Sequence, residues 1–417
     1  MTTNTASTPG VLSFEKAAAV VLEFCRQIGQ PPVEEQPILR AGGRILAEPV
    51  RADRDFPPFP RATRDGYALR SADIQAGGAR LRVVGQIKAG AEFAGTLSAG
   101  ETAEIMTGAA VPSGADAVVM VEYTRRDKDF VSVERACSPG ENVVAAGSEA
   151  RAGQEMLPRG IRLGFAQVAV AAAVGRTEIR VYRQPRVAIL STGDELVEAA
   201  GTPGPFQIRN SNSYSLAAQT KAWGGEPVQL PIAPDDESEL KKLIEKGLDS
   251  DLLLLSGGVS MGKFDLVEQV LQSLEAKFFF TGAEIQPGRP VVFGEILRTG
   301  TRKPFFGLPG NPVSTMVTFD LFVRPVLEAL SGAVPVRLPT AKARLAHELK
   351  TKTGLTRFLP AVLQGTPLEP EVKVVSWQGS GDLMASAQAN CYVVVPPDKD
   401  SIAAGEMIAI LMRSCPN

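Results

Sequence analysis

The stretch from Asp251 to Asp265, DLLLLSGGVSMGKFD, has the residue types of an anion-binding loop. Its four consecutive leucines predict a strand buried on both faces of a parallel sheet, which ends at a Ser-Gly-Gly turn. Apolar residues then recur at helical spacing from Phe264, so the unit is predicted to be strand, glycine loop and helix. Free backbone N–H groups in such a loop and the N-terminus of the following helix favour a phosphate group.

Asp265 falls in the first turn of that predicted helix. A carboxylate beside a phosphate site usually implies a divalent cation between them. Taken alone, the loop is equally consistent with a tight turn in which Asp265 only starts the helix.

Two similar loops follow other predicted strands. From Arg186 onward, short apolar strands alternate with amphipathic helices, which predicts a doubly wound parallel α/β sheet. The carboxyl ends of such strands meet at one edge, where open sheets bind ligands. The residues expected at this edge are Thr192, Gly193, Asp194, Glu195, Ser256, Gly257, Gly258, Ser260, Asp265, Pro309, Gly310, Asn311 and Pro312.

A guanidinium completes this set. The segment Pro287-Gly288-Arg289-Pro290 holds Arg289 between prolines, and a rigidly held guanidinium suits a phosphate or another oxyanion. The residues therefore predict a Mg²⁺-assisted site for a phosphorylated ligand, without identifying the ligand.

The rest of the chain predicts three further parts. Residues 52–145 carry short strands separated by Gly and Pro, which indicates a small inserted β domain. Residues 12–51 and 146–182 flank it and are predicted to form one discontinuous N-terminal domain of helical and strand elements. The α/β domain covers 183–330, and strand-like runs in 331–417 predict a C-terminal β barrel.

Four polar residues in these parts are candidate site residues that also fit ordinary structural positions. Asp65 lies in an Asp-Gly turn and Thr107 precedes a glycine at a strand end, and by themselves both are ordinary turn residues. Arg357 and Ser380 lie in segments that could reach a neighbouring site, although alone they fit a surface position and a turn.

Composition excludes several function classes. The net charge is −2 with interspersed charges, so no basic face for nucleic acid or membrane lipid is expected. No apolar run approaches the ~18 residues that span a bilayer. A single histidine excludes multi-histidine metal sites, and four scattered cysteines fit a reducing cytoplasm.

Five motifs occur in a specific order: DGYA at 65–68, MTGAAVPSGADAVV at 106–119, TGDEL at 192–196, SGGVSMGKFD at 256–265 and GLPGNP at 307–312. With these separations the chain, from about residue 12 to its end, resembles the molybdopterin molybdenumtransferase family. That family includes bacterial MoeA proteins and the E domain of gephyrin.

The resemblance implies an L-shaped, four-part chain that forms a homodimer through its N-terminal linker domain. It implies Mg²⁺-dependent insertion of molybdate into adenylylated molybdopterin, with release of AMP and molybdenum cofactor. An upstream adenylyltransferase and molybdoenzyme acceptors would be its protein partners. By the same resemblance Asp65, Thr107, Glu195 and Asp265 would be catalytic, and Glu195, Asp235 and Asp265 would hold the metal.

The remaining carried-over positions bind the substrate. They include the two prolines of the last loop, and Asp65 and Thr107 would face the sheet-edge loops of the other subunit. The substrate-binding set is Thr192, Gly193, Asp194, Ser256, Gly257, Gly258, Ser260, Arg289, Pro309, Gly310, Asn311, Pro312, Arg357 and Ser380.

The chain departs from the family pattern at a few positions. Glu149 stands for an aspartate, Asn210 for an aspartate, and Gln286 and Arg289 for lysines. These changes bear on affinity and oxyanion choice more than on reaction class. Two alternatives stay open: a paralogue that prefers tungstate, and a non-catalytic scaffold that binds molybdopterin.

Overall fold

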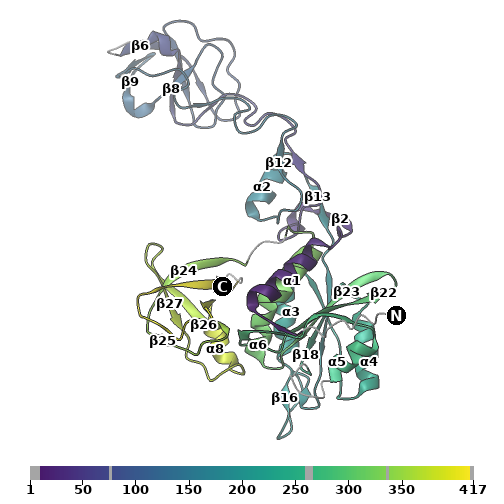
Figure 1. The fold of residues 1–417 in the computed structure, drawn as a ribbon. Helices are drawn as coiled ribbons and strands as arrows, with labels where there is room; N and C mark the ends of the chain where they lie inside the picture. The colour runs from purple at the N-terminus through teal and green to yellow at the C-terminus, as the bar shows by residue number, and fades with distance from the viewer. Residues whose placement is uncertain (1–9, 75–77, 259–265, 335–337, 414–417) are drawn as a thin grey trace, which may run out of the picture.

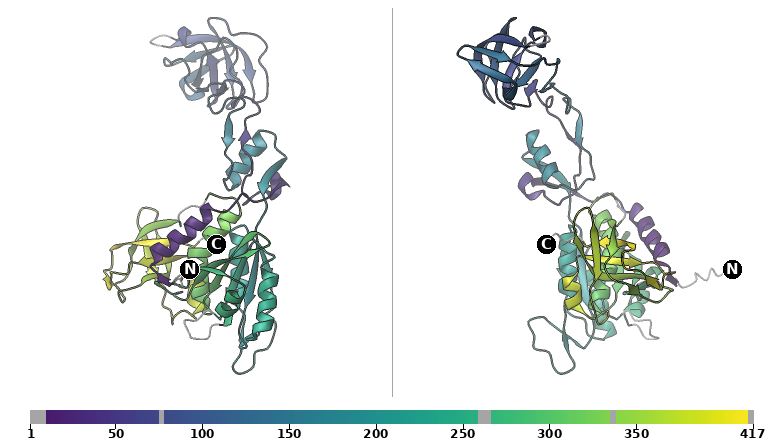
Figure 2. Two further views of the ribbon diagram at one scale, coloured as in Figure 1. Left: turned by 45° about the vertical axis from the view of Figure 1, so that its right-hand side comes forward. Right: turned by 90° about the vertical axis from the view of Figure 1, so that its left-hand side faces the viewer.

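The protein is elongated, with two domains side by side at one end and a β domain at the other (Figures 1 and 2). The computed structural model describes residues 10–74, 78–258, 266–334 and 338–413. A small body of paired strands and one helix separates the β domain from the wide end (Figure 1). No helix in these described ranges is long and apolar enough to cross a membrane.

A six-stranded sheet forms the centre of the α/β domain. Its strand order is β17-β14-β18-β23-β22-β19, and the first four strands run parallel. The predicted doubly wound order is confirmed for those four. The strands are β14 (Arg186–Ser191), β17 (Glu226–Gln229), β18 (Leu252–Ser256), β19 (Lys277–Phe280), β22 (Val292–Arg298) and β23 (Thr301–Leu308).

The last two strands depart from a purely parallel sheet. β22 pairs antiparallel with β23 and β19 pairs antiparallel with β22. Thr299 and Gly300 join β22 to β23, and both have positive φ, at 48° and 77°. A two-residue turn of this kind reverses the chain without a crossover helix, so β22 and β23 form a hairpin next to the edge strand β19.

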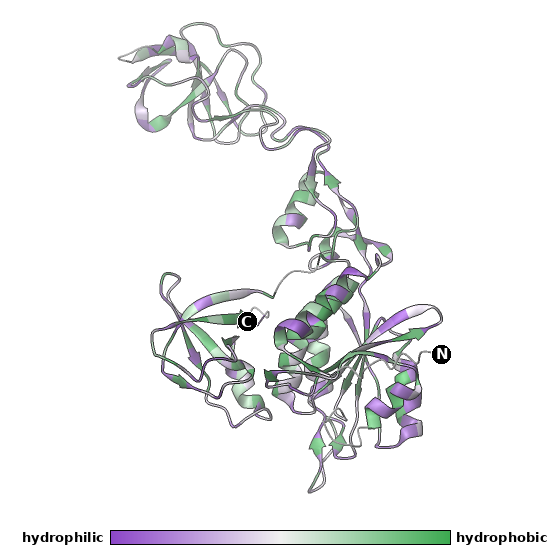
Figure 3. Ribbon diagram, in the orientation of Figure 1, coloured by the Kyte–Doolittle hydropathy of each residue, from purple (hydrophilic) through white to green (hydrophobic). Residues whose placement is uncertain are grey.

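Helices cover both faces of the sheet, with their apolar sides turned inward (Figure 3). Along β14, Val187 and Ile189 enter one core cluster while Ala188 and Leu190 enter the other, as the two-residue period of a strand requires. The helices on the first face are α1 (Phe14–Arg26), α3 (Asn212–Ala222), α6 (Pro312–Thr318), η4 (Phe319–Val323) and α7 (Arg324–Leu330). Those on the second face are α4 (Glu237–Gly247) and α5 (Leu266–Ser273).

The sequence predicts a kink or an end at Pro325, but the helical segment continues to Leu330. The π-helical turn η4 precedes α7, so Pro325 falls in the first turn of a new α-helical segment. The first turn of a helix requires no backbone N–H donor, and the ring of proline is accepted there.

The first helix of the chain is α1. Ser13 caps it by accepting a hydrogen bond from the Lys16 amide at 3.3 Å. Phe24 packs edge-on against Phe293 at 5.2 Å between ring centroids, and Phe14 does the same with Phe358 of the barrel at 5.0 Å. α1 therefore contacts both the α/β domain and the barrel. The strand β1 (Val11–Leu12) before it pairs with β20 (Gly282–Ala283).

The separating body combines segments from both sides of the inserted domain. β2 (Val33–Pro37) pairs antiparallel with β13 (Glu178–Tyr182), and β3 (Val50–Arg51) pairs with β12 (Glu155–Leu157). Together with η1 (Ile38–Arg40) and α2 (Phe165–Ala173) they enclose their own core cluster.

The inserted domain is all β, as predicted. Its main sheet has the order β8-β5-β7-β6-β10-β9, and a two-stranded ladder of β4 and β11 lies beside it. These elements are β4 (Arg61–Ala62), β5 (Gly66–Leu69), η2 (Ser71–Asp73), β6 (Ala79–Ile87), β7 (Glu101–Ile105), β8 (Ala117–Met120), η3 (Val121–Tyr123), β9 (Thr124–Asp127), β10 (Phe130–Val133) and β11 (Val143–Val144).

The predicted C-terminal barrel is confirmed, because β28 pairs with both β30 and β26 and so closes the ring. β21 (Ile285–Gln286) of the α/β domain adds itself to β26 and joins the two domains. The elements are β24 (Thr340–Leu345), β25 (Leu349–Lys350), β26 (Thr356–Gly365), β27 (Pro370–Val374), α8 (Leu383–Gln388), β28 (Cys391–Val395), β29 (Ser401–Ile402) and β30 (Met407–Met412).

A buried carboxylate also joins the barrel to the α/β domain. Asp320 in η4 accepts hydrogen bonds from Tyr392 Oη of the barrel at 3.2 Å and from Gln219 Nε2 of α3 at 3.1 Å. Burial raises the pKa of Asp320 from 3.8 to about 6, because the charged form loses its hydration there. Arg413 and Arg324 offset part of this effect.

We expect Asp320→Asn to change how stability depends on pH. Between about pH 4 and 6 the folded protein binds more protons at Asp320 than the unfolded chain, so this carboxylate makes the fold less stable as pH rises. The substitution should remove this loss of folding stability, which is on the order of 3 kcal/mol at pH 7. Urea unfolding of both proteins from pH 4 to 7 measures it.

Asp382→Asn is the control. Backbone amides of Ala385 and Gln378 lower the pKa of Asp382, so its contribution to stability is present above the unfolded pKa and is lost as pH falls. The two substitutions should therefore change the pH dependence in opposite directions. An identical pH dependence in wild type and Asp320→Asn would contradict the role given to Asp320.

Candidate functional site

A cavity of about 420 Å³ opens at the carboxyl edge of the sheet, where β14 and β18 end. The strand order reverses between these neighbours, since β14 leads to β17 on one side and β18 lies on the other. Crevices at such switch points are the usual ligand sites of open α/β sheets. The lining residues are Thr192, Glu195, Leu196, Ile208, Arg209, Asn210, Ser211, Asn212, Ser256, Gly257, Gly258, Pro290, Pro309, Gly310, Asn311 and Pro312.

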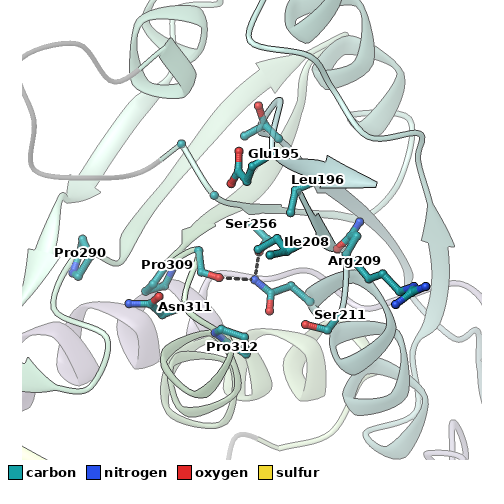
Figure 4. Close-up of a pocket in the computed structure, with 16 residues that line it drawn as sticks. Glu195, Leu196, Ile208, Arg209, Ser211, Ser256, Pro290, Pro309, Asn311 and Pro312 are labelled. Carbon is teal, nitrogen blue, oxygen red and sulfur yellow. Dashed lines mark hydrogen bonds between the residues drawn. The ribbon is translucent and has the colours of Figure 1, made fainter. Parts of the chain in front are cut away.

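The three predicted loops therefore meet at one place, and Figure 4 shows them around the cavity. Pro290 and Asn311 lie at one side of it, and Arg209 and Ser211 lie at the other. Ser260 and Asp265, which the sequence also predicts here, fall outside the described residues.

Two glycines are required by the close packing of these loops. Gly257 has φ of 90°, and a Cβ atom there would lie 2.6 Å from the carbonyl oxygen of Thr192. Gly193 has φ of 140°, and a Cβ atom there would overlap the carboxylate of Glu195. Neither position accommodates a side chain, so the loops after β14 and β18 approach each other through bare backbone.

Asn212 holds three loops together at the bottom of the cavity. Its Nδ2 donates to Ser256 Oγ at 2.8 Å and to the carbonyl oxygen of Gly310 at 2.7 Å. Asn212 is only 9% exposed, and its Oδ1 has no hydrogen-bond partner among the described residues. A buried acceptor without a partner is costly, so this atom is suited to receive a donor from a ligand.

The side chain of Asn210 links the start of α3 to the end of β14 next to this cavity. Its Oδ1 accepts a hydrogen bond from the Ser213 amide at 3.1 Å and another from Ser191 Oγ at 3.2 Å. These bonds fix the start of α3 against the end of β14.

Two helices begin at this cavity. α3 starts at Asn212 after Ser211, and α6 starts at Pro312 after Asn311. The first amides of a helix lack intrahelical acceptors and carry partial positive charge, so both ends favour an anionic group.

Acidic side chains lie on the other side of the Thr192 loop. Asp194 Oδ1 accepts a hydrogen bond from the Asp235 amide at 3.1 Å, and Thr192 Oγ1 lies 3.4 Å from Asp235 Oδ1. Glu195 lines the cavity itself. Within the described ranges, no three Asp, Glu, His or Cys side chains form a group that could hold a metal ion.

Mg²⁺ that binds together with a phosphorylated ligand needs fewer protein carboxylates than such a group. Mg²⁺ in proteins commonly takes one or two carboxylates and fills its other positions with phosphate oxygens and water. Glu195 and Asp235 supply two carboxylates on neighbouring loops, tied to each other through Asp194 and Thr192.

A second cavity of about 460 Å³ adjoins the first and shares Pro290, Pro309 and Asn311 with it. Arg289 and Ser380 line this second cavity, which lies where the α/β domain meets the barrel. Asn311 Nδ2 donates to Ser380 Oγ at 2.9 Å, and the Val313 amide donates to the Ser380 carbonyl at 3.0 Å. The barrel loop is therefore held against the loop that begins α6.

A third cavity of about 460 Å³ shares Gln286 and Trp377 with the second and is lined by Arg357. Arg357 is 6% exposed, and its Nη1 donates to the carbonyl oxygens of Lys352 and Leu355. Burial lowers the pKa of Arg357 from its ordinary value.

Asp65 and Thr107 are brought together, but far from the cavity of their own chain. Both lie at strand ends in the inserted β domain, at the opposite end of the molecule (Figure 1). Asp65 Oδ1 accepts hydrogen bonds from the Thr107 amide at 2.6 Å and from Thr107 Oγ1 at 2.7 Å. These two bonds hold the pKa of Asp65 below its usual value, so Asp65 is an anion at neutral pH.

Asn212, Ile208 and Arg209 are site residues that the sequence reasoning did not identify. Ile208 and Arg209 belong to β16 (Ile208–Arg209), which pairs with β15 (Leu196–Val197) and covers one side of the cavity. The signal for Asn212 was its place in Asn210-Ser211-Asn212, directly before a predicted helix. No local pattern marks Ile208 and Arg209, because only the fold brings their strand over the cavity.

Three family models match the chain in sequence. The MoeA N-terminal region (domain I and II) matches residues 12–175, the probable molybdopterin binding domain matches 188–329, and the MoeA C-terminal region (domain IV) matches 342–412. Together they follow the order of the parts described above.

Whole-chain relatives agree with these matches. A molybdopterin molybdenumtransferase of Nostoc sp. is 38% identical over 378 residues, covering 89% of this chain and 86% of the relative. One from Haemophilus influenzae is 32% identical over 408 residues, covering 96% and 98%. A crystal structure of the molybdopterin biosynthesis moeA protein from Pyrococcus horikoshii OT3 has a TM-score of 0.81 at 30% identity, covering 97% of this chain and 100% of that chain.

We expect Asn212→Ala to destabilise the loops around the cavity. The substitution removes both Nδ2 hydrogen bonds and leaves the carbonyl of Gly310 unpaired, which should lower the free energy of unfolding by about 1–3 kcal/mol. Urea unfolding measures the change. Ser215→Ala is the matched control, because Ser215 Oγ bonds only to the Asn212 carbonyl within α3. Equal effects of the two substitutions would contradict the cross-linking role.

Proposed function

The chain belongs to the molybdopterin molybdenumtransferase family and is a transferase of molybdenum cofactor biosynthesis, and we propose that it inserts molybdate into adenylylated molybdopterin with Mg²⁺ and releases AMP. The observation that carries the proposal is the cavity between β14 and β18. It combines a glycine loop, the N-terminal ends of two helices and the carboxylate of Glu195. These groups suit a phosphoanhydride bound together with a divalent cation.

The phosphates of the substrate would lie against the backbone of the glycine loop. Gly257 and Gly258 follow β18 at the cavity, and α3 and α6 begin at the same cavity. Asn212 Oδ1 would accept a hydrogen bond from a hydroxyl or amino group of the substrate. This arrangement orients the phosphoanhydride bond and keeps it at the sheet edge.

Glu195 and Asp235 would hold the cation on the phosphates. When bound, Mg²⁺ supplies a Lewis acid that offsets the negative charge that develops as the phosphoanhydride bond breaks. Asp194 fixes the loop of Asp235 through its backbone amide at 3.1 Å. Asp265, predicted as a further ligand, stays a prediction because it lies outside the described residues.

Molybdate would bind in the second cavity as a substrate oxyanion. Arg289 supplies a positive charge there, and Ser380 supplies a hydroxyl that is already held by Asn311. Because the two cavities share one wall, the oxyanion and the phosphates would lie next to each other on one substrate molecule.

A second copy of the chain would deliver Asp65 and Thr107. Within one chain these residues lie at the far end of the molecule from the cavity (Figure 1). A homodimer with two-fold symmetry could place the β domain of each subunit over the sheet edge of the other. The Asp65 carboxylate would then face the loops at that edge. We further propose a cytoplasmic enzyme that receives its substrate from an adenylyltransferase and delivers its product to molybdoenzymes.

The direct test is AMP release from adenylylated molybdopterin in the presence of Mg²⁺. We expect release with molybdate and little without it. Glu195→Gln should slow release by at least about 100-fold, because the carboxylate that offsets the developing charge is lost. Glu198→Gln, on an exposed part of the same loop, is the control and should leave the rate unchanged.

The metal and the oxyanion are separable in the same assay. Removal of Mg²⁺ by a chelator should abolish release. Release with tungstate alone would reassign the oxyanion, and tight substrate binding without AMP under any condition would replace the enzyme proposal with a binding scaffold.

We expect Asp65→Asn and Glu195→Gln to complement each other when the two variants are mixed. In a shared site each heterodimer regains one intact site, because one subunit supplies Asp65 and the other supplies Glu195. After subunit exchange, AMP release should recover to about one quarter of the wild-type rate. A mixture as inactive as its components would contradict the shared site.

A further inference from the structure

The three cavities described above adjoin one another, and we call this row of cavities the groove. The first and second share Pro290, Pro309 and Asn311, and the second and third share Gln286 and Trp377. The groove therefore runs from the edge of the α/β sheet, across the junction between the domains, to the face of the barrel. The phosphate and oxyanion sites occupy only its first two parts.

Trp377 is the feature that separates the second and third cavities. It follows β27 and is half-buried, packed against the cores of both the α/β domain and the barrel. Within the described ranges, no other aromatic ring or cation stacks on its indole, and its Nε1 has no hydrogen-bond partner. The other tryptophan, Trp223, is instead covered by the guanidinium of Arg324 at 3.4 Å from the ring centroid.

A half-buried indole without a polar or stacking partner, at the border of two cavities, is suited to a planar ligand. Aromatic side chains bind fused heterocycles by stacking, and the indole N–H remains available to an acceptor on the ligand. The exposed Gln286 side chain borders the same two cavities. An amide can donate and accept together, which matches the adjacent donor and acceptor atoms at the edge of such a heterocycle.

The order of groups along the groove decides which heterocycle this is. From the sheet edge to the barrel, the order is phosphate-binding loops, then Arg289 with Ser380, then Trp377. In adenylylated molybdopterin the phosphates lie between the adenosine and the dithiolene, and the dithiolene is attached to the pterin. With the phosphates at the glycine loops and the reacting dithiolene beside the oxyanion, the pterin is the next group in line.

We propose that Trp377 binds the pterin ring system of the substrate by stacking, with Gln286 at its edge. The inference rests on the proposed function, because it takes the two anion sites as assigned there. It places the adenosine at the opposite end of the groove, on the side of Ile208 and Arg209. A groove with this polarity would hold the dithiolene next to Arg289 and would leave the released AMP free to depart from the other end.

The test compares the ligand affinities of Trp377→Ala and Trp377→Phe, and it measures fluorescence in a Trp223→Phe variant that keeps Trp377. Because the chain has two tryptophans, Trp223→Phe leaves Trp377 as the only indole reporter. We expect molybdopterin without its AMP group to quench the fluorescence of Trp377, while AMP leaves it unchanged. Isothermal titration then gives the Kd of each probe for wild type and both Trp377 variants.

Trp377→Ala should raise the Kd for molybdopterin about 10- to 100-fold and leave the Kd for AMP unchanged. Trp377→Phe should keep most of the affinity, since it retains a stacking ring, and circular dichroism of both variants confirms that the barrel is folded. An unchanged Kd for molybdopterin in Trp377→Ala would overturn the inference. Weakened AMP binding instead would also overturn it, since that result would place the adenosine at Trp377.

The proposed function is checked separately in the same samples. Molybdate-dependent AMP release by the wild-type enzyme tests the transferase reaction, whatever the Kd values of the variants. A wild type that releases AMP while Trp377→Ala binds molybdopterin normally would remove the pterin site and leave the proposed function in place.

Discussion

The parallel alignment of β14, β18 and β23 is the constraint on which the site depends. These strands run in the same direction, so the loops at their carboxyl ends emerge at the same edge of the sheet and lie in close contact. The approach is close enough that Gly257 could not carry a side chain without striking the backbone of Thr192. Asn212 then fixes the distance between the loops with two hydrogen bonds. The close approach of these loops is thus a consequence of the parallel strand direction.

The barrel is joined to the α/β domain beside this edge of the sheet. Ser380 binds the loop that begins α6, β21 adds to the barrel sheet, and Tyr392 bonds the buried Asp320 of the α/β domain. Each contact joins a polar group of the barrel to the element that carries the cavity. The junction is therefore held by directional bonds as well as by apolar packing, and such bonds define one relative position of the two domains. A groove that crosses the junction keeps its shape for this reason.

The inserted β domain, unlike the barrel, lies far from the cavity of its own chain (Figure 1). Its Asp65–Thr107 pair is well ordered by its own hydrogen bonds, yet no element of the same chain brings it to the sheet edge (Figure 1). A preformed carboxylate at the far end of an elongated molecule is consistent with use by another subunit. The elongated shape and the shared site that we propose are then two aspects of one architecture.

The sequence by itself determined the order of the parts, the strand–loop–helix units and the residue types at the sheet edge. These follow from local periodicity and turn chemistry, as the four leucines before Ser256 illustrate. Only the tertiary structure decided which distant residues complete the site. Arg209 and Trp377 reach the groove because of strand pairing and domain packing, which act between residues far apart in the chain and leave no local pattern. The hairpin at Thr299 and Gly300 likewise reversed the direction of β22, because backbone torsions at a two-residue turn outweighed the expectation of a parallel crossover.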